Sequence, residues 1–90
     1  MSKQSGDLSG QLRDETLAAL SRCPAGKALS PSDIAQAVGG PHPDGWGPLM
    51  QPLRRVIVAL AHEGRLVILR KGKPANPDDF RGIYRIAPPA

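Results

Sequence analysis

Residues 48–70, PLMQPLRRVIVALAHEGRLVILR, decide the fold, because one periodicity gives way to another within them. As far as Glu63 the aliphatic side chains recur at helical spacing, and Gly64 then supplies a C-terminal cap. Residues 65–70 are rich in β-branched and leucine side chains, which is typical of a strand. The stretch therefore predicts a helix over residues 48–63 followed directly by a strand. The core stripe of the helix is formed by Leu49, Leu53, Val56, Ile57 and Leu60.

Two more helices are predicted upstream of this stretch. A helix with Ser9 or Asp7 as its N-cap is predicted to run to about Arg22, because apolar side chains recur at helical spacing, and Pro24 and Gly26 stop it. These side chains are Leu8, Leu12, Thr16, Leu20 and Cys23. The first helix is therefore expected to lie against the core with one apolar face.

The clearest helix start in the sequence is Ser30-Pro31-Ser32-Asp33. The hydroxyl of Ser30 can accept hydrogen bonds from the first turn, and Pro31 suits the first helical position because its missing N–H is not needed there. The carboxylate of Asp33 complements the positive end of the helix dipole. The pattern predicts a helix of about two turns, which Gly39-Gly40 ends.

A loop is predicted over residues 39–47, GGPHPDGWG, because glycine and proline dominate it. We expect Trp46 to cover an edge of the core rather than to stack on a ligand. Counted this way, about nine residues separate the second and third helices, against the three or four of a tight helix-turn-helix.

A second strand is predicted over residues 83–86, after a long hairpin loop over residues 71–82. Alternation along the two strands turns Leu66 and Ile68 toward the core together with Tyr84 and Ile86. Two strands alone are marginally stable in water, so the hairpin must pack on the helices. The opposite side of the hairpin is expected to carry Val67, Leu69, Ile83 and Arg85.

Length and composition limit the class of protein. Ninety residues are enough for one modest core, and we expect a single domain over residues 9–87 between a flexible tail, residues 1–8, and a short C-terminal tail, residues 88–90. The polar start is unlike a secretory signal, and no apolar run approaches the roughly 20 residues that span a bilayer. Together with the single cysteine, these features favour a cytoplasmic protein without membrane contact.

The order of helix, helix, helix, strand, basic loop and strand resembles the winged helix-turn-helix fold over about residues 9–87. Residues 27–29 would take the place of that fold's first small strand. More narrowly, PSDIAQAVGG (31–40), the pattern W-x-x-L-M-x-P-x-R (46–54), HEGRL (62–66) and KGKP…FRGIYRI are similar to a small bacterial family of uncharacterised winged-helix proteins. The resemblance implies a mainly α-helical α+β fold with three helices and a C-terminal two-stranded β-hairpin, the wing.

In winged-helix proteins the third helix lies in the major groove of duplex DNA and the wing contacts the neighbouring backbone or minor groove. The resemblance therefore implies that the helix over residues 48–63 reads base edges and that the wing, residues 70–81, contacts phosphates. The expected groove-facing side chains are Gln51, Arg54, Arg55, Val58 and His62. The expected phosphate contacts are Arg70, Lys71, Lys73 and Arg81, with Ser30 and Ser32 at the start of a helix.

The distribution of charge agrees with this expectation. The formal charge is +4, but residues 1–45 contain four basic and five acidic side chains, whereas residues 46–90 contain eight basic and three acidic ones. An excess of positive charge on one part of the chain is what contact with phosphates requires. Asp44, Asp78 and Asp79 would repel phosphates, and a solvated face of ordinary surface charge is the alternative interpretation.

A protein-interaction or dimerisation module is the main competing function. An apolar strip of Val67, Leu69 and Ile83 on the outer side of the hairpin would suit a protein partner or a second copy of the chain. Single-stranded RNA is less attractive as a ligand, because three aromatic side chains offer little base stacking.

Catalysis is not expected. Cys23, His42 and His62 are the side chains that could form a dyad or a metal site, and their spacing matches no metal motif. The sequence therefore predicts neither an enzyme nor a cofactor or metal site.

Overall fold

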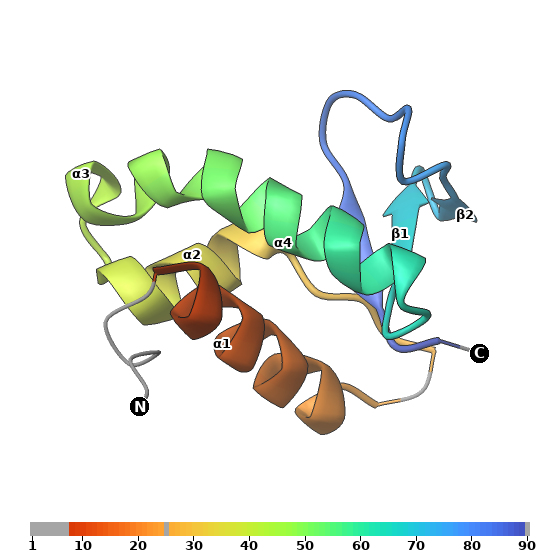
Figure 1. Ribbon diagram of the computed structural model, residues 1–90, viewed down its shortest axis with the longest axis horizontal. Coiled ribbons are helices and arrows are strands. Elements are labelled where there is room, and N and C mark those ends of the chain that lie inside the picture. The colour runs from red at the N-terminus through yellow and green to blue at the C-terminus, as the bar shows by residue number, and fades with distance from the viewer. Residues whose placement is uncertain (1–7, 25, 90) are drawn as a thin grey trace.

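The computed structural model describes residues 8–24 and 26–89, and it shows a mainly helical α+β arrangement (Figure 1). The helices are α1 (Leu8–Arg22), α2 (Pro31–Gly39), the one-turn α3 (Pro43–Trp46) and α4 (Met50–His62), with a 3₁₀ turn (Gly47–Leu49) leading into α4. The strands are β1 (Val67–Arg70), β2 (Lys73–Pro74) and β3 (Arg85–Ala87).

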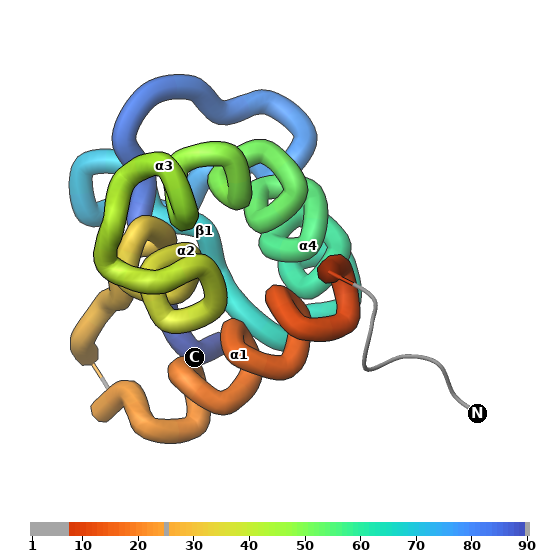
Figure 2. Tube along the Cα trace, turned by 90° about the vertical axis from the view of Figure 1, so that its left-hand side faces the viewer, coloured from red at the N-terminus to blue at the C-terminus, as the bar shows by residue number. Residues whose placement is uncertain are grey.

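The helices α1, α2 and α4 pack against one another, and the small sheet covers one end of this bundle (Figures 1 and 2). The core stripe of α4 is buried at Leu53, Ile57 and Leu60, as its spacing predicts. Leu49 and Val56 pack against the margin of the core. Because the stripe repeats over three turns, α4 contributes to the core along most of its length.

Helix α1 begins at Leu8, the earlier of the two starts that the sequence leaves open. Leu8, also placed at the end of the predicted tail over residues 1–8, is therefore helical, and residues 1–7 lie outside the described residues. The predicted face is buried at Leu12, Thr16 and Leu20. The hydroxyl of Thr16 is satisfied inside the helix, where it donates to the carbonyl oxygen of Leu12 at 2.6 Å.

Helix α2 starts where the sequence indicates, although not through the predicted side-chain cap. Ser30 is extended, and its side chain makes no capping hydrogen bond. Its hydroxyl is instead paired with that of Ser32, at 2.9 Å between the two Oγ atoms. Pro31 at the first helical position and Asp33 in the first turn remain as the local reasons for this start.

The loop predicted over residues 39–47 contains a turn of helix, α3, so that part of the prediction is wrong. The side chain of His42 caps this turn, because its Nδ1 accepts the N–H of Asp44 at 3.2 Å, and Pro43 follows at the first helical position. The short element packs closely on α2. A Cβ atom on Gly45 would collide with the carbonyl oxygen of Gly39, so this approach requires glycine.

The sheet has three antiparallel strands in the order β2-β1-β3, one more than expected. Ile68 pairs with Ile86 and both are buried, which confirms the predicted core side of the hairpin. Leu29 forms an isolated bridge with Ile86 on the other edge of β3. The added strand β2 arises because the chain turns back at Lys71-Gly72 and pairs for two residues with β1.

Candidate nucleic-acid interface

The basic residues of the second half of the chain keep their charge uncompensated. In the part of the chain that the structure describes, no arginine or lysine after residue 46 forms an ion pair with a carboxylate. The arginines that do so, Arg13 and Arg22, belong to α1. The positive charge of α4 and the hairpin is therefore not neutralised by contacts within the described residues.

The return loop, residues 75–84, determines which side chains of α4 remain accessible. It leads from β2 to β3 and arches over α4 (Figures 1 and 2). At its centre, Phe80 is only 5% exposed. Gln51 and Arg55 are exposed on α4, whereas Arg54 and Val58 are half-buried.

Arg54 fixes the return loop to α4. Its Cζ lies 3.8 Å from the centroid of the Phe80 ring and 5.8 Å from that of the Tyr84 ring. A guanidinium N–H of Arg54 also donates to the carbonyl oxygen of Phe80. The two rings meet edge to face, with centroids 4.9 Å apart. Arg54, expected among the groove-facing side chains, is thus engaged in holding the loop.

A second tether lies at the C-terminal end of α4. The Nε2 of His62 is 2.8 Å from Oδ1 of Asp78, and both side chains are more than half exposed. Exposed ion pairs contribute little to stability, so we expect this contact to stabilise the position of the return loop only weakly. It also brings an acidic group of the wing against a side chain expected to face DNA.

Arg70 is used in a similar way to Arg54. Its Nη1 donates to the carbonyl oxygen of Ile83 at 2.7 Å, which joins the end of β1 to the segment before β3. Lys71, Lys73 and Arg81 are exposed. Of the four expected phosphate contacts in the wing, three therefore have accessible side chains and the fourth is tied to the backbone.

Lys71 occupies an unusual backbone conformation. Its φ is 53°, and Gly72 follows with φ 80°, so both central residues of the two-residue turn are left-handed. Such turns match the twist of a hairpin but favour asparagine or glycine at the first central position. A lysine there is held at the tip of β1 and β2 with its side chain in solvent.

Ser30 and Ser32 lie at the start of α2, so they belong to a different helix from the expected groove-facing side chains of α4. With Met50 at the start of α4 and Ile83 and Tyr84 of the return loop, they line a cavity of about 360 Å³. The structure thus brings together the start of α2, the start of α4 and the end of the return loop, which are far apart in the sequence.

The outer side of the hairpin is less apolar than expected. Val67 and Leu69 are half-buried, and only Ile83, at 85%, is broadly exposed among the three residues of the predicted strip. The hydroxyl of Tyr84 is buried without a hydrogen-bond partner among the described residues. Burial raises the pKa of Tyr84, and the positive charge of Arg54 offsets part of that rise.

The role of Phe80 is not predicted by any sequence pattern, since it stands in a polar segment rich in glycine and proline. The available signal was its size, because a phenylalanine in such a segment is more often buried than solvated.

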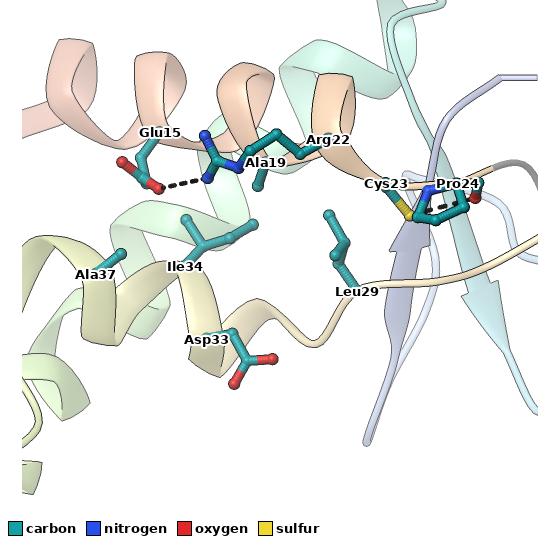
Figure 3. Close-up of a pocket in the computed structure, with 9 residues that line it drawn as sticks. All are labelled: Glu15, Ala19, Arg22, Cys23, Pro24, Leu29, Asp33, Ile34 and Ala37. Carbon is teal, nitrogen blue, oxygen red and sulfur yellow. Dashed lines mark hydrogen bonds and ion pairs between the residues drawn. The ribbon is translucent and has the colours of Figure 1, made fainter.

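A different cavity, of about 320 Å³, lies between α1 and α2 (Figure 3). It carries the acidic side chains of Glu15 and Asp33, and an ion pair of 3.6 Å joins Glu15 to Arg22. Cys23 at its edge donates to the carbonyl oxygen of Lys27 at 3.5 Å. Within residues 8–24 and 26–89, no group of three or more His, Cys, Asp or Glu side chains could hold a metal ion.

Fold and surface together define a small, mainly helical α+β protein with a basic helix-and-hairpin surface. A model of the family described as "Protein of unknown function (DUF3253)" matches residues 9–89, so the chain belongs to that family. None of the curated proteins matches the chain. Among the described residues, none of the helices combines the length and apolar character needed to cross a membrane. The family description gives no activity, so a function has to be argued from the surface.

Proposed function

We propose that the chain is a winged-helix domain that binds duplex DNA through α4 and the wing. The observation that carries this proposal is the uncompensated positive charge of that surface, where exposed Arg55, Lys71 and Lys73 have no carboxylate partner in the described structure. Like charges on one surface repel one another, and a bound anion relieves this repulsion. The polyanionic backbone of DNA also releases counterions when basic side chains replace them, which favours binding.

The strand order supports the winged-helix assignment. β1 and β3 are adjacent and antiparallel, and Leu29 pairs with Ile86 on the free edge of β3. This is the position that the short first strand of a winged helix would occupy. The strand β2 and the return loop are then elaborations of the wing between β1 and β3.

The geometry narrows the set of side chains that would read bases. Gln51 and Arg55 are exposed on α4, and their donors suit adenine and guanine edges. Arg54 would have to leave Phe80 and Tyr84 before it could enter a groove, and His62 is exposed but pairs with Asp78. We therefore expect binding dominated by the backbone, with Lys71, Lys73 and Arg81 on phosphates and weak preference for sequence.

Binding to a fluorescent random 20-base-pair duplex, measured by anisotropy across salt concentrations, tests the proposal. Three phosphate contacts, from Lys71, Lys73 and Arg81, predict a slope of log affinity against log salt of about −2.7. Affinity that does not depend on salt, or no binding at low salt, would contradict the proposal.

A pair of charge-matched variants locates the interface. Lys71→Asn/Lys73→Gln removes two charges from the wing, and Arg13→Gln/Arg22→Gln removes two from α1, which lies on the other side of α4 from the return loop (Figures 1 and 2). We expect the first to weaken binding about tenfold or more and to reduce the slope by roughly 2, and the second to change affinity less than about threefold, because screening confines charge effects to about 10 Å. Equal losses would mean that total charge alone drives binding.

A protein-interaction module is the second candidate, favoured by the 85% exposure of Ile83. A partner or second copy would cover this side chain together with the half-buried Leu69. Sedimentation of the parent chain and of Ile83→Ser over a range of concentrations tests it: a dimer that Ile83→Ser disperses supports this function, and a parent that stays monomeric argues against self-association.

A further inference from the structure

A cavity of about 420 Å³ lies between the end of β1 with its turn, residues 69–72, and residues 83–85, where the chain enters β3. Its walls combine two kinds of side chain. Leu69, Ile83 and Tyr84 provide apolar surface, and Arg70, Lys71 and Arg85 provide positive charge. No acidic residue of the described chain lines it. The volume falls in the range of sites that hold small molecules, which are also mostly apolar with a few placed polar groups.

The charges of this cavity are available to a ligand. Lys71 and Arg85 are exposed, and neither forms an ion pair in the described part of the chain. Arg70 is held in place by its hydrogen bond to the carbonyl oxygen of Ile83. Because that acceptor is neutral, the guanidinium keeps its charge at the cavity. The cavity between α1 and α2 is the opposite case, since Glu15 and Asp33 line it.

The backbone at Lys71 gives a separate reason to assign this lysine a role. Its left-handed φ of 53° is unfavourable for a side chain with a Cβ, and asparagine or glycine would form the same turn more easily. Residues in unfavourable conformations cluster at binding and catalytic sites, where the side chain is needed.

We propose that this cavity binds a small organic anion, in which one carboxylate meets Lys71 and Arg85 and an apolar ring or short chain lies against Leu69 and Ile83. Duplex DNA would reach the two cations from outside but would not fill the apolar wall, because its phosphates and sugars are polar. The proposal does not depend on DNA binding. If DNA also binds here, the anion competes with it for Lys71.

Titration of the isotope-labelled chain with sodium benzoate, followed by ¹H–¹⁵N correlation spectra, tests the proposal. We expect saturable shifts centred on residues 69–72 and 83–85, with a dissociation constant on the order of 1 mM for so small a probe. Benzyl alcohol has the same ring without the charge and should bind at least fivefold more weakly. Sodium chloride at equal ionic strength should give no saturable shifts at these residues.

Two lysine variants distinguish binding of benzoate in the cavity from general electrostatic attraction of the anion to the basic surface. Lys71→Asn is expected to weaken benzoate binding at least fivefold, and it leaves the turn intact because asparagine tolerates the left-handed conformation. Lys73→Gln removes the same charge two residues away, outside the cavity lining, and should leave binding within twofold.

The proposal is overturned if benzoate gives no saturable shifts, if benzyl alcohol binds as tightly, or if Lys73→Gln and Lys71→Asn weaken binding equally. The result is independent of the proposed function, because the titration contains no DNA. Saturable benzoate binding by a chain that fails to bind the duplex would support the cavity and reject the DNA-binding function.

Discussion

The surface formed by α1 and the surface formed by α4 and the hairpin use their arginines differently. On α1, the guanidinium of Arg13 donates to both carboxylate oxygens of Glu63, at 2.9 and 2.7 Å, and Arg22 is paired with Glu15. In the other region, Arg54 and Arg70 bind the backbone carbonyls of Phe80 and Ile83, and Arg54 also packs on aromatic rings.

This difference has an electrostatic consequence. A carboxylate partner fixes an arginine and cancels its charge, whereas a carbonyl oxygen or a ring fixes it and leaves the charge in place. The hairpin region therefore gains structural order from its arginines without losing positive potential. That property suits a surface that binds anions, because the main attachment of the return loop to α4, through Arg54, does not use a carboxylate.

Removing the aromatic attachment is expected to have the largest effect. Phe80→Ala should lower the free energy of unfolding by about 3–5 kcal/mol, because a buried ring is deleted and the support of Arg54 is lost. Urea denaturation followed by circular dichroism measures the change. Since such a loss approaches the total stability of a small domain, Phe80→Leu is the companion variant, with a smaller expected cost.

The ionic tether of the same loop provides the contrast. Asp78→Asn removes the charge opposite His62, and we expect it to cost less than about 1 kcal/mol, because both side chains are largely exposed. If Asp78→Asn were as costly as Phe80→Ala, the return loop would be held by charge, and the distinction between the two regions would fail.

A second test concerns the connection between α2 and α4, which lies outside both regions. Gly45→Ala should destabilise the fold by about 1–3 kcal/mol, because the new methyl group would collide with the carbonyl oxygen of Gly39, which is backbone and cannot easily move. Gly47→Ala is the matched control: a Cβ there meets nothing within 4 Å, and the backbone is helical, so stability should change by less than about 0.5 kcal/mol. Thermal unfolding of both variants distinguishes a specific collision at Gly45 from a destabilisation that any glycine-to-alanine substitution in this segment would cause.

The elements that were predictable from sequence are those with a local pattern. The stripe of α4 and the burial of Ile68 and Ile86 follow from periods of 3.6 and 2 residues, which a single segment displays. The start of α2 follows from Pro31 and Asp33, even though the side chain of Ser30 does not cap it. The clustering of basic residues in the second half was likewise visible as a count.

The contacts that decide which side chains are accessible left no such pattern. Arg54 and Phe80 are 26 residues apart, and no periodicity connects them. The helical wheel of α4 places Val58 and His62 opposite the core stripe and Arg54 on its flank, and only the path of the return loop shows that Arg54 and His62 are engaged by Phe80 and Asp78. The strand β2 spans two residues and contains a proline, which is too short for an alternation to be recognised. α3 was missed because its proline and glycine are also typical of loops.

Tyr84 tests the hairpin region with a smaller expected effect. Tyr84→Phe should raise the free energy of unfolding by about 1 kcal/mol, because it removes a buried hydroxyl that lacks a hydrogen-bond partner in the described structure. Burial raises the pKa of Tyr84 above its ordinary value of 10.0. Folding therefore favours the protonated phenol, and this contribution is present below pH 10 and is lost as the pH rises through the folded-state pKa.

The chain has one tyrosine, so the increase in absorbance near 295 nm with rising pH reports the ionisation of this group above the constant absorbance of Trp46. The folded protein should titrate above pH 10, and the urea-unfolded chain should titrate near 10. An equal midpoint in both states would show that the phenol is solvated in the folded protein, contrary to its burial.

The smallest effect is expected on the α1 surface, at the pair of Arg13 and Glu63. The hydrogen bonds from Arg13 hold the pKa of Glu63 below its ordinary value of 4.5, with burial opposing the shift. A carboxyl group whose pKa is lowered by folding stabilises the protein above the unfolded-state value, and this contribution is lost as the pH falls through the folded-state value. Glu63→Gln should therefore be slightly less stable than the parent at pH 7 and equal to it once the pH is well below the folded-state pKa of Glu63.

Because the pair is exposed, 1 M salt should shrink the difference at pH 7 as well. A double-mutant cycle with Arg13→Gln assigns the effect to the pair, since Glu63→Gln should cost nothing once Arg13 is gone. If the difference in stability between the parent and Glu63→Gln persisted at low pH, Glu63 would contribute through packing at the end of α4. Charge pairing would then no longer distinguish the α1 surface from the hairpin.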